Sequence, residues 1–90
     1  MRHAIGYTDF RKSEMTPKKI VKWLNEFAYD PEETSGYHGN IKFHETPIYK
    51  NRDEAVKAIE KLDKGWYDDH AVLYKDGRKL MWLVKYEYHC

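Results

Sequence analysis

Ninety residues are enough for one domain, residues 1–90, but not for two separate hydrophobic cores. Hydrophobic residues make up 41% of the chain, charged residues 34% and aromatic residues 16%, a composition that excludes a disordered chain. Sixteen basic residues oppose fifteen acidic ones without a basic tail or an acidic block, which argues against bulk nucleic-acid binding.

The chain begins with an expected strand followed by a helix. Residues 3–10 are rich in β-branched and aromatic side chains and predict a strand, although Gly6 lies in its middle. Thr16 and Pro17 predict a helix start, with Thr16 as the N-cap and Pro17 in the first turn. The helix is expected to end at Asp30, because Pro31 disfavours helical dihedral angles in the residue before it. Apolar side chains recur along one face of this helix: Ile20, Val21, Leu24, Phe27 and Ala28.

A second strand and a second helix are expected in the middle of the chain. Residues 37–49 predict a half-buried strand that is interrupted at Pro47, because proline cannot donate a hydrogen bond to a ladder. Asn51 and Glu54 form a capping-box pattern that starts a helix, and Gly65 is expected near its end. The apolar face of this helix consists of Ala55, Val56, Ile59 and Leu62.

The last third of the sequence predicts a β-hairpin over residues 70–88. Asp76 and Gly77 separate two β-rich runs, and as a two-residue turn they would place Leu73 opposite Leu80. Apolar residues on both faces of the final strand indicate an interior strand, or one covered on its second face. The expected fold is therefore α+β with the order β-α-β-α-β-β: a two-layer sandwich in which two helices cover a mostly antiparallel sheet of about four strands.

Catalytic chemistry is not indicated, and we expect neither an enzyme nor a bound metal or cofactor. The five histidines show no recognised ligand spacing. Asp68 and His70 could act together as alternate residues of a strand, but no serine or cysteine has a helper beside it. A small metal-dependent hydrolase around Asp68, His70 and His44 remains the last of the alternatives.

A partner-binding patch is expected instead, because fourteen aromatic residues exceed what so small a core can bury. Residues 36–40 and 66–70 each precede an expected strand. If those two strands are parallel neighbours, both segments lie at one end of the sheet. The predicted patch then consists of Tyr37, His38, Asn40, Trp66, Tyr67, Asp68 and His70. Alternatively, these residues close the end of the core.

A small nucleic-acid-binding domain is the second functional hypothesis. The lysines of the two helices could form one basic layer on the sandwich, or an aromatic sheet face could stack bases. Acidic residues lie among both sets, which favours a protein partner.

Three stretches carry a family resemblance: residues 35–40 (Ser-Gly-Tyr-His-Gly-Asn), 65–72 and 82–90. They resemble small uncharacterised proteins of bacterial phages and mobile elements. The resemblance implies a non-enzymatic inhibitor that occludes the surface of a host defence protein, as anti-CRISPR proteins do. A cytoplasmic location is expected, because the single cysteine, Cys90, allows no internal disulfide and the apolar run 80–84 is too short to cross a membrane.

Overall fold

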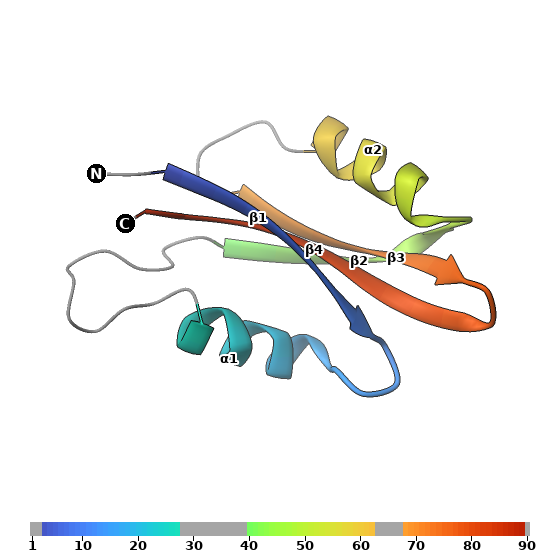
Figure 1. Cartoon of the computed structure of the whole chain (residues 1–90), viewed down its shortest axis with the longest axis horizontal. Helices are drawn as coiled ribbons and strands as arrows, with labels where there is room; N and C mark the ends of the chain where they lie inside the picture. The colour runs from blue at the N-terminus through green and yellow to red at the C-terminus, as the bar shows by residue number, and fades with distance from the viewer. Residues whose placement is uncertain (1–2, 28–39, 63–67, 90) are drawn as a thin grey trace.

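The computed structural model describes residues 3–27, 40–62 and 68–89, which form four strands and two helices in the predicted order (Figure 1). The strands join one sheet in the order β1-β4-β3-β2, in which β2 is parallel to β3 and the other neighbours are antiparallel. The predicted α+β class and the mostly antiparallel four-stranded sheet are confirmed. The elements are β1 (His3–Arg11), α1 (Pro17–Phe27), β2 (Asn40–Tyr49), α2 (Arg52–Leu62), β3 (Asp68–Asp76) and β4 (Lys79–His89).

Both helices begin at the caps that the sequence predicts. The backbone N–H of Lys19 donates to Oγ1 of Thr16 at 3.3 Å, and the N–H of Glu54 donates to Oδ1 of Asn51 at 2.9 Å. Each bond satisfies one of the backbone donors that a helix start leaves unpaired. The sequence predicts that the first helix ends at Asp30 and the second near Gly65. Both of these positions lie outside the described residues. Neither described helix is long and apolar enough to cross a membrane.

The β3–β4 hairpin forms as predicted, but the predicted register is wrong by two residues. Asp76 pairs with Lys79 and Leu73 pairs with Trp82, so the two-residue turn is Gly77-Arg78 and not Asp76-Gly77. Gly77 has a φ of 61°, the left-handed value that glycine adopts most easily at the first turn position. Because side chains alternate with a period of two, a shift of two residues leaves the predicted faces of β4 unchanged.

The two helices lie on opposite faces of the sheet, which corrects the predicted two-layer arrangement (Figure 1). The chain crosses from β1 at one edge to β2 at the other through α1, then returns from β2 to β3 through α2. These strands are all parallel to one another. Since crossovers between parallel strands share one hand, crossovers in opposite lateral directions place their helices on opposite faces.

Each helix packs on its own apolar cluster, so the central strands are buried on both faces. Ile20 and Leu24 of α1 pack with Ala71, Leu73, Trp82, Val84 and Tyr86. On the other face, Ala55 and Ile59 of α2 pack with Val72, Tyr74 and Leu83. This double burial explains the continuous apolar runs in β3 and β4, and it confirms that the final strand is an interior one.

Gly6, which interrupts the β-rich pattern of β1, makes room for an aromatic ring. It is the register partner of Tyr86, and a Cβ atom at Gly6 would lie 2.4 Å from Cζ of that tyrosine. The Tyr86 ring is held by an edge-to-face contact with Trp23, whose ring centroid is 5.9 Å away. Trp23 in turn contacts Phe10, so an aromatic chain links α1 to β1.

Candidate functional site

The structure confirms the strand arrangement on which the predicted patch depends. Asn40 and Asp68 are register partners in the parallel β2–β3 ladder, so β2 and β3 begin at the same end of the sheet. Only the backbone of these two residues is described. Four members of the patch lie outside the described residues, and the patch therefore stays a prediction: Tyr37, His38, Trp66 and Tyr67.

His70, the remaining member of the patch, is buried and contacts a second histidine. Nδ1 of His70 lies 3.0 Å from Nε2 of His44, a half-buried residue on β2. A hydrogen bond at this distance needs one ring nitrogen to donate and the other to accept, so one of the two contacting nitrogens carries no proton. The sequence hypothesis of a hydrolase included this pair, and the structure brings the two rings together.

Three buried charged residues lie beside His70 at the same end of the sheet, and we call them the buried charge cluster: Asp69, Lys85 and Glu87. Nζ of Lys85 donates to Oε1 of Glu87 at 2.5 Å and lies 3.9 Å from Oδ1 of Asp69. The same Asp69 oxygen accepts the backbone N–H of Glu87 at 3.1 Å. Lys85 is only 2% exposed, so these carboxylates compensate a positive charge that burial would otherwise make very costly.

The sequence pattern did not predict the buried charge cluster. Asp69, which lies between the two candidate residues Asp68 and His70, is fully buried and accepts a hydrogen bond from the backbone of β4. The sequence does contain one indication of the cluster: Lys85 and Glu87 lie on one face of a strand that was predicted to be interior, where charged side chains must be paired. Among the described residues, no group of three histidine, cysteine, aspartate or glutamate side chains is placed to hold a metal ion.

A second polar network fixes the start of α2 to β1. Arg52, the first residue of α2, donates from Nε and Nη2 to the two carboxylate oxygens of Asp9 at 3.0 and 3.2 Å. The Tyr74 hydroxyl donates to the same carboxylate. Burial, followed by this hydrogen bond, raises the pKa of Tyr74 above its ordinary value. The hydrogen bond to Asp9 likewise raises the pKa of Arg52.

Beyond Asp9, the α2-side face of β1 carries exposed apolar side chains. Ile5 and Tyr7 are 55% and 38% exposed, and they alternate with Gly6 along the strand. Ile5 pairs with Glu87 and Tyr7 pairs with Lys85 in the β1–β4 register. The two side chains therefore lie on the same face of the sheet as α2, which covers β3 and β4 on that face. In the described chain, β1 pairs only with β4, which leaves its outer backbone groups available for hydrogen bonding.

The other edge of the sheet is protected against strand pairing. Pro47 lies within β2, and the β2–β3 register shifts between His44 and Ile48. Proline and a break in the ladder are devices that keep an edge strand from pairing with another chain. Because β1 has neither device, the two edges are not equivalent, and β1 is the open one.

Comparisons with protein families, curated proteins and solved structures found no match for this chain.

Proposed function

We propose that this protein is a small non-enzymatic protein-binding module whose partner adds an extended segment to the open edge of β1. Such a module would suit a phage or mobile element that occludes a host defence protein. The single observation that carries the proposal is the open edge of β1 with Ile5 and Tyr7 exposed beside it. Strand addition takes its affinity from backbone hydrogen bonds and its specificity from alternate side chains.

The chemistry of this edge defines the kind of partner. A segment pairing with β1 would place apolar side chains beside Ile5 and Tyr7 on the α2 side of the sheet. Ile5 lies towards the end at which β2 and β3 begin, because it pairs with Glu87 near the C-terminal end of β4.

A non-enzymatic role agrees with the state of the buried charge cluster. Lys85 and its carboxylates are buried and paired with one another, so in this conformation they are closed to a substrate. We therefore interpret the cluster as part of the structural core, which holds the end of β4 against β3.

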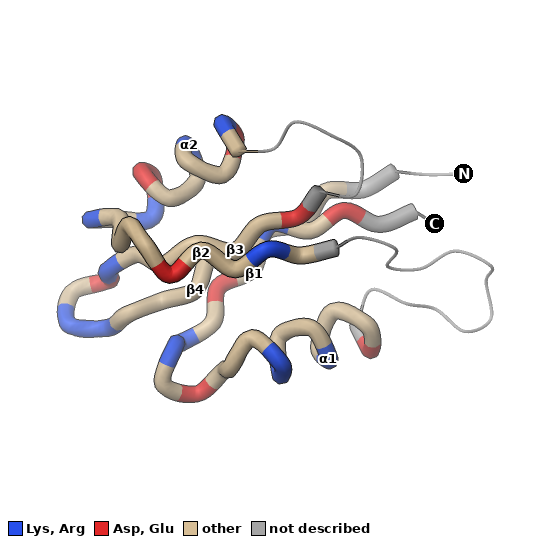
Figure 2. The backbone as a smooth tube through the Cα atoms, turned by 180° about the vertical axis from the view of Figure 1, so that it is seen from behind, with Lys and Arg blue, Asp and Glu red and all other residues tan. Residues whose placement is uncertain are grey.

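Neither surface suggested for nucleic-acid binding, the lysines of the two helices or an aromatic face of the sheet, supports the nucleic-acid hypothesis. The lysines of α1 and α2 lie on opposite sides of the sheet and cannot form one basic layer (Figure 2). Each face of the central strands is also covered by a helix, and the aromatic side chains that the structure describes on β3 and β4 are buried.

The proposal is tested by capture from a bacterial lysate with three forms of the chain. Ile5→Lys adds a charge to the open edge, while Ile48→Lys makes the same change at a 45% exposed position on the protected edge. We expect one protein to be recovered in stoichiometric amount with the unmodified chain and with Ile48→Lys. With Ile5→Lys, capture should fall by about tenfold, which corresponds to about 1.4 kcal/mol of binding free energy.

Three results would contradict the proposal. Equal capture by Ile5→Lys would show that the partner does not use the β1 edge. Recovery of nucleic acid without a stoichiometric protein would reject a protein partner. Sedimentation of a dimer that Ile5→Lys dissociates would show that β1 pairs with a second copy instead. Tyr37→Ala and Tyr67→Ala test the predicted patch separately: lost capture at an unchanged melting temperature assigns it to the interface, and lost stability assigns it to the core.

A further inference from the structure

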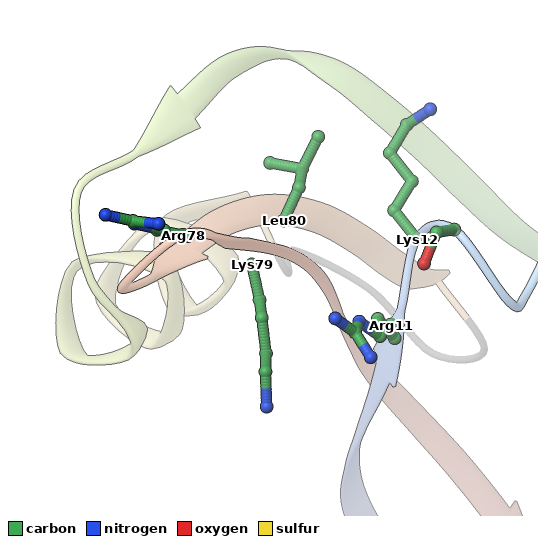
Figure 3. A pocket seen from close by; sticks show the side chains of 6 residues that line it. Arg11, Lys12, Arg78, Lys79 and Leu80 are labelled. Atoms are coloured by element: carbon green, nitrogen blue, oxygen red, sulfur yellow. The ribbon is translucent and has the colours of Figure 1, made fainter.

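A cavity at the far end of the sheet from the predicted patch is lined mainly by cationic side chains. It has a volume of about 360 Å³ and lies between the end of β1 and the start of β4 (Figure 3). Four of its six lining residues are basic, and we call these four the basic tip: Arg11, Lys12, Arg78 and Lys79. Ser13 and Leu80 complete the lining.

The positive charge of the basic tip is largely uncompensated. Arg11 lies 3.7 Å from Glu14, and both side chains are exposed. Asp76 faces Lys79 across the hairpin in the register but makes no ion pair with it. Within the described ranges, Lys12 and Arg78 likewise have no carboxylate at ion-pair distance. The chain as a whole has a net charge of only +1, so this end is a local excess of positive charge.

The directions of the four side chains restrict the ligand. Figure 3 shows Arg11 and Lys79 on one side of the ribbon and Lys12 on the other, while Arg78 extends along the hairpin end. Side chains that diverge in this way cannot converge on one phosphate group. They can instead meet successive phosphates of a flexible chain that curves round the end of the sheet. A straight duplex would reach only one side.

We propose that the basic tip binds the phosphate backbone of single-stranded nucleic acid. The contacts are between ammonium or guanidinium groups and phosphate oxygens, so binding is independent of sequence and falls as salt rises. With no aromatic side chain among the six that line the cavity, base stacking adds nothing and the affinity is modest.

The test measures binding of a fluorescent oligothymidylate of about 12 nucleotides, a length within the range of single-strand sites, by anisotropy over a series of salt concentrations. Four phosphate contacts on a single strand predict a slope of log K against log salt of about −2.8. The double substitution Arg78→Gln with Lys79→Gln should reduce its magnitude by about 1.4. Both side chains are exposed, so folding is expected to be unchanged.

The matched control is Lys57→Gln with Lys61→Gln, which removes the same charge from exposed positions on α2. An equal loss of affinity in this control would mean that net charge alone is responsible and would overturn the proposal. Absence of binding at about 50 mM salt would also overturn it, since this electrostatic term is strong at low salt. Equal competition by oligoglutamate would indicate an acidic protein, and equal binding of duplex DNA would contradict a single strand. Ile5→Lys should leave oligothymidylate binding unchanged, because Ile5 lies far from the basic tip. Failure of this proposal can therefore be distinguished from failure of the proposal that a partner binds the β1 edge.

Discussion

The packing of Tyr86 on Gly6 yields a quantitative prediction. An alanine at position 6 would place its Cβ atom 2.4 to 2.9 Å from Cζ, Oη and Cε1 of Tyr86, so the ring must move. The ring is buried and held by Trp23, and overpacking of this kind costs about 1–3 kcal/mol. Replacing glycine by alanine also lowers the entropy of the unfolded chain, which returns about 0.4–1 kcal/mol. We expect Gly6→Ala to lower the free energy of unfolding by about 0.5–2 kcal/mol.

A double-mutant cycle separates the close contact from any general effect of the substitution. Tyr86→Leu removes the three ring atoms that the new Cβ would meet. In that background, Gly6→Ala should be neutral or stabilising, and the coupling free energy should equal the overpacking cost of about 1–3 kcal/mol. Urea unfolding followed by circular dichroism measures all four forms. The reasoning is refuted if Gly6→Ala leaves the unmodified chain as stable as before, or lowers stability equally in both backgrounds.

The remaining predictions concern the turn, the buried lysine and the buried tyrosine. Gly77→Val should cost about 1 kcal/mol or more through backbone strain alone, because nothing lies within 4 Å of the new Cβ. Gly77→Asn should cost less, and equal melting temperatures for the two variants would contradict the turn geometry. Lys85→Met removes the buried cation beside the carboxylates of Asp69 and Glu87 and should cost about 3–5 kcal/mol in urea unfolding, whereas the exposed Lys75→Met should change little. Because the pKa of Tyr74 is raised in the folded state, its contribution to stability is present below about pH 10, the unfolded value, and is lost as pH rises above it. Tyr74→Phe should flatten this alkaline loss in pH-dependent unfolding, and an unchanged profile would contradict the assignment.

Much of the local structure follows from the sequence because short-range interactions decide it. Thr16 and Asn51 satisfy backbone donors only three residues away, so the helix starts are recognisable without knowledge of the fold. The hairpin is equally local. Its turn shifted by one position because Asp76 and Gly77 also match a turn signal, and a pattern of residue types does not show which residue takes the left-handed conformation.

For the site, the sequence predicts which strands are neighbours but not which side chains meet. The β-α-β pattern correctly indicated that Asn40 and Asp68 begin neighbouring parallel strands. The contact between His44 and His70, by contrast, joins residues 26 apart in the sequence. The Asp69–Lys85 ion pair depends in the same way on how the start of β3 meets the C-terminal half of β4. Such contacts follow from the ladder register, which the sequence pattern does not determine to a single residue.

The sequence by itself determined the elements, their order and the two apolar helix faces, since each arises from periodicity or capping within a short segment. Only the tertiary structure decided which sheet face each helix covers. That choice depends on the strand order β1-β4-β3-β2, because the chain crosses the sheet in one direction through α1 and returns through α2. Crossovers of one hand in opposite directions must use opposite faces. With α2 placed over β3 rather than β1, Ile5 and Tyr7 are left exposed beside an open edge.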